Sequence, residues 1–262
     1  VYLAARTPVK AADAIAQIKA AVPSANIEFL QLDLGGFKSV KEAVDVFTCS
    51  SDRLDILINN AGVMALPPQL TNDGYEIQYG INHMGHALLT KLLLPILTHT
   101  ASQPGSDVRV VFLSSGGATL APKGGIAFTD TTTSMANYST WTRYGQSKAA
   151  NILYAAEFAR RHPNITATSC HPGAVNTELA TTFKANHWLI GHIINLLTPV
   201  LAKDVEDGVK NQLWCATGKD VINGRFYFPV SKAHEIRGFP KDKKLGKDLW
   251  EWTEKELVNR GY

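Results

Sequence analysis

Short apolar runs alternate with segments of helical period along all 262 residues of the chain. The apolar runs are continuous rather than alternating with polar residues, which is typical of strands buried on both faces of a sheet. Such strands separated by helices predict a doubly wound parallel sheet, an α/β fold of the Rossmann-like kind. Strands are expected at residues 1–5, 27–34, 54–58, 108–113, 165–169 and 225–228. Helices are expected at residues 11–22, 40–47, 73–97, 143–161, 188–201, 205–216 and 246–259, with a loop over 118–142.

Composition narrows the class of protein. Hydrophobic residues make up 45% of the chain and charged residues 19%, so we expect one domain over residues 1–262 with a sizeable core. The net charge of +3 comes without a dense basic run, and this excludes a nucleic-acid surface. The cysteines lack ligand or disulfide spacing, and we expect all three to be reduced and buried. They are Cys49, Cys170 and Cys215.

Ligands of doubly wound sheets bind at the carboxyl ends of the strands, so the residues there are candidates for a site. Arg6 follows the first strand, where a dinucleotide's ribose is bound, and no acid accompanies it. A guanidinium suits a 2′-phosphate, which favours NADP over NAD, although a solvated surface arginine is an equal alternative. Asp33 follows the second strand and either accepts a bond from an adenine amine or caps the next loop. Gly62 allows close approach of a ligand after the third strand.

Tyr144 and Lys148 are four residues apart at the start of a helix and share one face. A phenol is a weak base at neutral pH, and a lysine ammonium one turn away is expected to lower its pKa. Such a pair moves the proton of an alcohol or a carbonyl. Two surface residues of an amphipathic helix are the alternative. Ser115, at the end of the fourth strand, supports the catalytic interpretation because its hydroxyl suits the substrate oxygen.

Together these residues resemble the short-chain dehydrogenase/reductase family over nearly the whole chain. The motifs that carry the resemblance are Asn59-Asn60-Ala61-Gly62, Asn82, Ser115, Tyr144 with Lys148, and His171-Pro172-Gly173. Residues 81–86, the long spacing from Ser115 to Tyr144, and residues 224–228 are most similar to the retinol-dehydrogenase-like branch, which includes many fungal members.

The resemblance implies a role for each matching residue. Tyr144 is then the acid/base, Lys148 tunes it and binds the nicotinamide ribose, Ser115 orients the substrate oxygen, and Asn82 holds a water beside Lys148. The cofactor would contact Asp33, Leu34, Asn60, Ala61, Gly62, Pro172, Gly173, Val175 and Thr177 besides Arg6, Tyr144 and Lys148. His83 and His86 lie three apart on a helix, but the family uses no metal there and none is expected.

One departure from the family concerns the start of the chain. The family begins with a strand, a glycine-rich turn and a helix whose N-terminus holds the pyrophosphate. Here Val1 matches the family's second strand, and the first glycine is Gly35. We therefore expect residues 1–262 to lack the first, central strand, to bind cofactor poorly and to fold marginally.

The sequence thus predicts an NADP-dependent oxidoreductase that interconverts a carbonyl and an alcohol on a hydrophobic small molecule. A truncated, non-catalytic paralogue with a binding or regulatory role is the alternative. Residues 188–201 predict a lid over an apolar pocket, for a retinoid, a steroid, a fatty aldehyde or an intermediate of secondary metabolism. An interfacial helix on an internal membrane is the second interpretation of that segment. A cytoplasmic location is expected, and a homodimer is left open.

Overall fold

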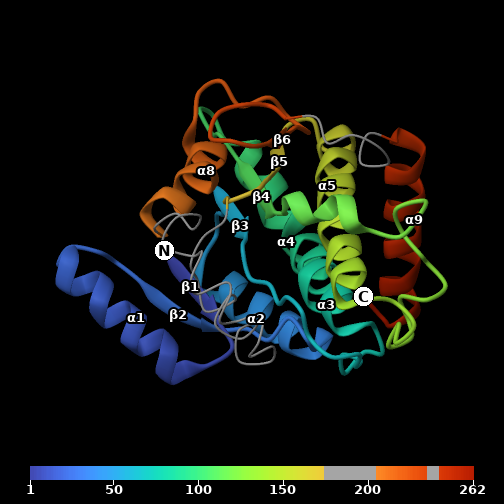
Figure 1. Ribbon diagram of the computed structural model, residues 1–262. Coiled ribbons are helices and arrows are strands. Elements are labelled where there is room, and N and C mark those ends of the chain that lie inside the picture. The colour runs from blue at the N-terminus through green and yellow to red at the C-terminus, as the bar shows by residue number, and fades with distance from the viewer. Residues whose placement is uncertain (174–204, 235–241) are drawn as a thin grey trace.

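The computed structural model describes residues 1–173, 205–234 and 242–262 (Figure 1). Every predicted strand within these ranges is present; four have shorter bounds inside the predicted ranges, and β3 and β5 end one residue later than predicted. The strands are β1 Tyr2–Ala5, β2 Glu28–Gln31, β3 Ile56–Asn59, β4 Arg109–Leu113, β5 Thr166–Cys170 and β6 Phe226–Tyr227. The helices are α1 Pro8–Ala21, α2 Phe37–Ser50, α3 Ile77–Tyr79, α4 Gly85–Ala101, α5 Thr140–Arg161, α8 Val205–Thr217 and α9 Lys243–Asn259. The expected helix at 188–201 lies outside the described residues.

The strands form two parallel sheets. β1 pairs with β2, and the second sheet has the order β3-β4-β5-β6. Within the described residues no strand joins the two sheets. The α/β class with parallel strands is therefore confirmed, but the sheet is divided between β1 and β3, where the sequence predicted a missing central strand.

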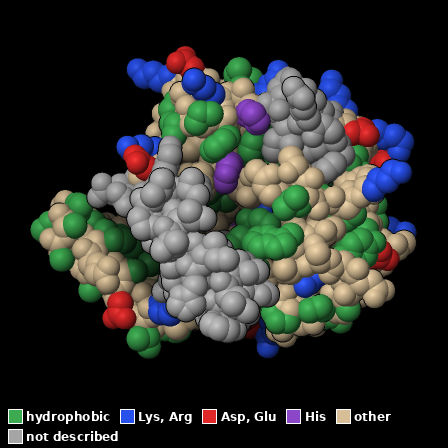
Figure 2. Space-filling model, viewed as in Figure 1, with side chains coloured by type: hydrophobic (Ala, Val, Ile, Leu, Met, Phe, Trp, Pro, Cys, Tyr) green, Lys and Arg blue, Asp and Glu red, His purple; other side chains and the backbone are tan. Residues whose placement is uncertain are grey.

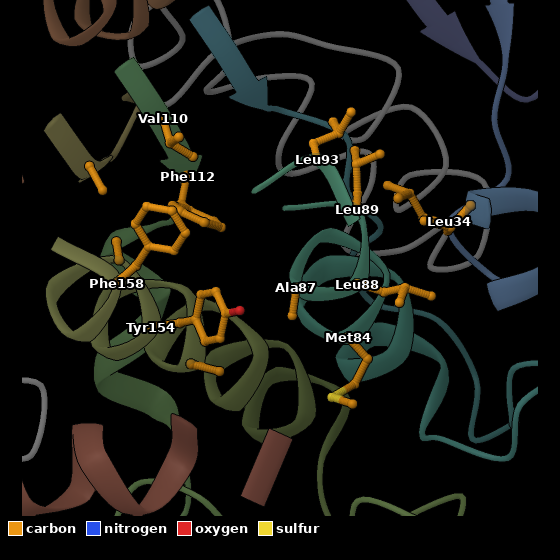
Figure 3. Packing of buried hydrophobic residues seen from close by; sticks show 14 of the residues in the cluster. Leu34, Met84, Ala87, Leu88, Leu89, Leu93, Val110, Phe112, Tyr154 and Phe158 are labelled. Carbon is orange, nitrogen blue, oxygen red and sulfur yellow. The ribbon is translucent and has the colours of Figure 1, made fainter. Parts of the chain in front are cut away.

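The middle strands of the four-stranded sheet, β4 and β5, are covered on both faces, as apolar parallel strands require. Val110 and Phe112 of β4 point into the main core with α4 and α5, and Figure 3 shows Ala87 of α4 on the side that faces Phe112 and Tyr154. The alternate β4 residues contact α8 in a second, smaller core. The members of this smaller core are Val111, Leu113, Cys170, Cys215, Ala216 and Tyr227.

Two expectations were wrong in detail. The helix expected over 73–97 consists of the short α3, a π-helical turn at Gly80–Met84 and α4, which continues through the exposed Pro95. Cys49 is exposed, whereas Cys170 and Cys215 are buried, and all three are free thiols.

Acidic and basic side chains are interspersed around the rim of the face in Figure 2.

Candidate active site

Tyr144 and Lys148 lie near the start of α5, which Ser139 caps by accepting a hydrogen bond from the Thr142 amide at 3.0 Å. One helical turn separates the two side chains, and the Lys148 Nζ lies 5.7 Å from the centroid of the Tyr144 ring. Lys148 Nζ donates to the carbonyl of Leu113 at 3.2 Å. The predicted pair therefore meets at the carboxyl end of β4, with both side chains buried.

Ser115 directly follows β4 and completes the group on the other side of the phenol. A side-chain hydrogen bond joins Ser115 to Tyr144. The Ser115 Oγ also accepts from the Gly117 amide at 3.1 Å, and this bond holds the turn after the strand in place. A Cβ at Gly117 would lie 3.2 Å from the Tyr144 ring, so a side chain there would crowd the phenol.

Asn82 is fully buried in the π-helical turn and ties three segments together. Its amide oxygen accepts from the Val63 amide at 2.7 Å, and its amide nitrogen donates to the Val63 carbonyl at 2.9 Å. The same nitrogen donates to the Ser147 hydroxyl at 2.9 Å. Turns of this kind are frequent at functional sites because they change the direction in which helix groups point.

Gly62 allows Asn82 and Lys148 to pack closely against its backbone. A Cβ at this position would lie 3.1 Å from the Asn82 Oδ1 and 3.3 Å from the Lys148 Nζ. The two neighbours of Gly62 that the sequence named for the cofactor, Asn60 and Ala61, are exposed beside it. The absence of a side chain at Gly62 therefore lets this segment lie against Asn82 and Lys148.

Burial controls the proton affinities of the pair. It raises the pKa of Tyr144, and the hydrogen bond with Ser115 offsets part of that rise. It also lowers the pKa of Lys148 to about 8, because an ammonium is costly away from water. The expected lowering of the Tyr144 pKa by Lys148 is wrong for this geometry, in which the lysine nitrogen is bonded to Leu113 rather than to the phenol.

His171 begins the segment after β5. Burial, with a smaller effect of the Lys148 charge, lowers the pKa of His171 to about 4, so the imidazole is neutral. Its Nδ1 accepts from the Gly173 amide at 3.3 Å, and Gly173 has a φ of 94°, which favours glycine. Pro172 and Gly173 thus follow the strand that flanks Ser115. Val175 and Thr177 lie outside the described residues.

The residues predicted for the adenosine side lie beside the two-stranded sheet, apart from the catalytic group. Arg6 is exposed just after β1, and its carbonyl accepts from the Gln31 side chain at 2.8 Å. Asp33 accepts from the Gly35 amide at 2.9 Å, which is the loop-capping role that the sequence left open. The side chain of Leu34 is buried in the main core.

Three supporting residues carried no recognisable sequence signal. Ser147 donates to the Tyr144 carbonyl at 2.7 Å, and Asn151 donates to the Leu113 carbonyl at 3.0 Å beside Lys148. The His86 Nδ1 lies 3.0 Å from the Asn82 carbonyl oxygen. Helical spacing places His86 four residues after Asn82, but buried polar partners of this kind are visible only once the fold is known.

Comparison with known proteins decides the family. The short chain dehydrogenase family model matches residues 1–188. The chain belongs to the short-chain dehydrogenase/reductase family, whose members are NAD(P)-dependent oxidoreductases. A short-chain dehydrogenase/reductase of Aspergillus calidoustus is 34% identical, over 99% of this chain and 86% of its own length. Retinol dehydrogenase 12 of Mus musculus is 35% identical over 95% of this chain and 76% of its own length.

Solved structures agree with the assignment of the fold. A protein from Mycobacterium paratuberculosis has 29% sequence identity and a TM-score of 0.72, covering 98% of this chain and 83% of its own. The NADPH-bound carbonyl reductase from chicken fatty liver has 20% identity and a TM-score of 0.60, covering 86% of this chain and 83% of its own. Among the described residues, no helix combines the length and apolar character needed to cross a bilayer.

Proposed function

We propose that this family member is an NADP(H)-dependent enzyme that interconverts a carbonyl and an alcohol on a hydrophobic small molecule. The observation that carries the proposal is the meeting of Tyr144, Ser115, Lys148 and Asn82 at the carboxyl end of β4. These four groups come from three separate elements and are mostly buried, which is not expected of surface residues on an amphipathic helix.

The residues around Lys148 fit a nicotinamide cofactor. Asn60 and Ala61 are exposed beside Gly62, and the Lys148 ammonium at the carboxyl end of β4 is a donor from which a ribose hydroxyl could accept a hydrogen bond. The bound cofactor would supply or accept the hydride, and the protein would orient the reacting atoms.

The chain's own residues handle the proton. The raised pKa of Tyr144 keeps its phenol protonated, ready to donate to the oxygen of a carbonyl that is being reduced. The Ser115 hydroxyl, bonded to the same phenol, orients that oxygen. Lys148 has a pKa of about 8 and can exchange a proton close to neutral pH. Asn82 is hydrogen-bonded to the backbone of Val63 and to the hydroxyl of Ser147. These bonds fix the position of α5 beside the site.

Arg6 supports the preference for NADP. It is a cation at the carboxyl end of β1, and Thr7 and Pro8, which follow it, bring no carboxylate that could bind a free ribose hydroxyl. Arg6→Ala is expected to weaken NADPH binding about tenfold or more, the loss of a charge-assisted hydrogen bond, with little change for NADH. Cofactor fluorescence titration measures both, and Lys244→Ala, at an exposed lysine on α9, is the control.

Tyr144→Phe tests the catalytic assignment. Reduction of apolar aldehydes and ketones, followed through loss of NADPH absorbance, should be abolished while NADPH affinity stays nearly unchanged. Tyr138→Phe is the matched control, because Tyr138 bonds only to Asp130 among the contacts of its hydroxyl in the described structure. Normal turnover in Tyr144→Phe contradicts the proposal, and cofactor binding without any turnover of the unaltered protein favours the non-catalytic alternative.

A further inference from the structure

Two aromatic side chains follow the last two strands of the four-stranded sheet. β5 ends at Cys170 and β6 ends at Tyr227, and these two residues are partners in the parallel register. The next residues are His171 and Phe228, whose ring centroids lie 4.6 Å apart with a tilt of 37° between the ring planes. This arrangement is closer to a stack than to an edge-on contact, so the two rings, called the aromatic pair below, form one continuous surface.

The aromatic pair lies next to the turn that carries Ser115. A Cβ at Gly116 would lie 3.7 Å from the His171 Nε2, so the imidazole lies beside that glycine. A Cβ at Gly117 would lie 3.2 Å from the Tyr144 ring. The turn after β4 therefore contacts the phenol through one glycine and the aromatic pair through the preceding one. The pair thus borders the place where a reacting carbonyl would meet Ser115 and Tyr144.

Backbone hydrogen bonds fix the position of the aromatic pair. The His171 amide donates to the Tyr227 carbonyl at 3.1 Å. The buried Asn211 of α8 donates to the His171 carbonyl at 2.8 Å and to the Tyr227 carbonyl at 2.9 Å. The Phe228 amide donates to the Lys232 carbonyl at 3.0 Å, where the chain folds back on itself. Because these bonds form within the protein itself, a substrate that packs here loses little binding free energy in ordering the two rings.

Both rings are uncharged, and the Phe228 ring is accessible. Phe228 is 36% exposed, although phenylalanine is among the residue types most often buried. His171 is half-buried, and burial lowers its pKa to about 4, so its imidazole is neutral at physiological pH. A neutral imidazole can pack against an apolar ring, whereas an imidazolium would retain water. The surface of the pair is therefore suited to a flat apolar group rather than to a charged one.

We propose that the aromatic pair of His171 and Phe228 determines substrate specificity by packing against a flat aromatic ring attached to the reacting carbonyl. The favoured substrate class is an aryl aldehyde or an aryl ketone, with its oxygen at Ser115 and Tyr144 and its ring on the pair. Contacts between aromatic rings add binding free energy beyond that of burying the same area, and a saturated ring does not provide it. This inference rests on the proposed oxidoreductase function and assigns no proton or hydride transfer to either residue.

The test compares benzaldehyde with cyclohexanecarbaldehyde, which share one carbon skeleton but differ in the flatness of the ring. The assay measures kcat/KM for NADPH-dependent reduction of both. The two aldehydes differ in intrinsic reactivity, so the ratio of benzaldehyde to cyclohexanecarbaldehyde is compared among variants. Phe228→Leu should lower this ratio about two- to tenfold, the usual contribution of an aromatic pair. The loss should appear mainly in KM for benzaldehyde, because the ring is bound in the ground state and in the transition state alike.

Three further variants show whether the effect belongs to the aromatic pair. Phe228→Tyr keeps the ring and should keep the ratio. His171→Leu removes the second ring and should lower the ratio. Phe29→Leu is the matched control, because Phe29 is a 37% exposed phenylalanine on β2, in the two-stranded sheet. It should leave the ratio unchanged, and circular dichroism checks that each variant is folded.

The outcomes separate this inference from the proposed function. Turnover of both aldehydes with a ratio unchanged in Phe228→Leu and in His171→Leu, or an equal fall in Phe29→Leu, would overturn the role of the pair and leave the oxidoreductase function in place. Turnover of neither aldehyde would count against the proposed function instead. Competition measured by saturation-transfer NMR then tests the pair through the affinities for benzyl alcohol and cyclohexylmethanol. An equal effect of Phe228→Leu on both affinities would overturn the inference, and a selective loss for benzyl alcohol would support it.

Discussion

The buried ion pair between Arg143 and Glu76 offers a direct test of how the catalytic residues are held. Arg143 precedes Tyr144, and its guanidinium donates to the Glu76 carboxylate at 2.9 Å and to the Leu66 carbonyl at 2.9 Å. Glu76 also accepts from the Tyr79 amide at 2.7 Å at the start of the helical segment that contains Asn82. The perturbation is Arg143→Met, which keeps an apolar stem of similar length but removes the charge.

The size of the expected loss of stability follows from the burial of both side chains. Arg143 is 2% exposed and Glu76 is not exposed at all, so the variant leaves a carboxylate without its counter-ion and without access to water. Breaking a buried pair from one side costs about 3–5 kcal/mol. That is a large part of the roughly 5–15 kcal/mol by which a domain is stable. The double variant Glu76→Gln with Arg143→Met should lose clearly less stability. The Gln side chain can still accept the hydrogen bond from the Tyr79 amide, and it carries no charge.

The loss should depend on pH in a defined direction. Burial raises the pKa of Glu76 above its ordinary value in the folded protein. A group with a raised folded pKa favours the folded state when it is protonated, and this contribution disappears as the pH rises through the folded pKa. Without Arg143 the folded pKa should rise further. The single variant should therefore be less destabilised at acid pH than at neutral pH, and the double variant should not show this difference.

Urea denaturation of the three proteins at two pH values gives the free energies of unfolding. NADPH-dependent turnover measured in parallel should fall in Arg143→Met, because the positions of Tyr144 and Asn82 both depend on the pair. A loss of stability below about 1 kcal/mol, or a loss equal to that of the double variant at every pH, would refute the reasoning from an uncompensated buried charge.

Three further predictions follow from the same structure. Carbonyl reduction should slow as the pH rises through the pKa of about 8 of Lys148, and Lys148→Arg should move that fall to higher pH, as seen in a pH–rate profile. Burial lowers the pKa of His83 to about 3, so the folded protein favours the neutral imidazole. This contribution to folding stability is fully present above pH 6.5 and is lost as the pH falls toward 3. His83→Gln should thus remove up to about 5 kcal/mol of the acid sensitivity of urea unfolding, and the exposed His99→Gln should not. Gly85→Ala should lower the thermal midpoint, because its Cβ would lie 2.5 Å from the Leu34 carbonyl oxygen, whereas Gly246→Ala, 3.7 Å from its nearest neighbour, should raise it.

The sequence predicted the parallel α/β class and the residues on the catalytic side of the site because both depend on local patterns. Apolar runs mark buried strands, and the polar residues that end them must lie at one edge of a parallel sheet. Tyr144 and Lys148 are separated by one helical turn, so their proximity needs no tertiary information. The place of Ser115 in the site could be predicted because the alternation of strands and helices already implied that β4 ends beside α5.

Features that depend on burial were not accessible in this way. The π-helical turn at Asn82 places an extra residue in a helix, and helical spacing alone does not reveal such an insertion. The pKa of Tyr144 depends on the loss of water around the phenol and on where the Lys148 nitrogen is bonded, and both emerge only from packing. Cys49 was expected inside because its residue type is usually buried, yet it lies on the exposed side of α2.

The division between the sheets explains why the two halves of the proposed cofactor site depend on different contacts. The catalytic group is held by strand pairing and by α5, whereas Arg6 belongs to a sheet that is joined to the rest through α2 packed on α4. The close approach of Gly85 to the Leu34 carbonyl lies in that same junction, one residue after the turn that holds Asn82. A change there would move Arg6 relative to Lys148 without altering either residue.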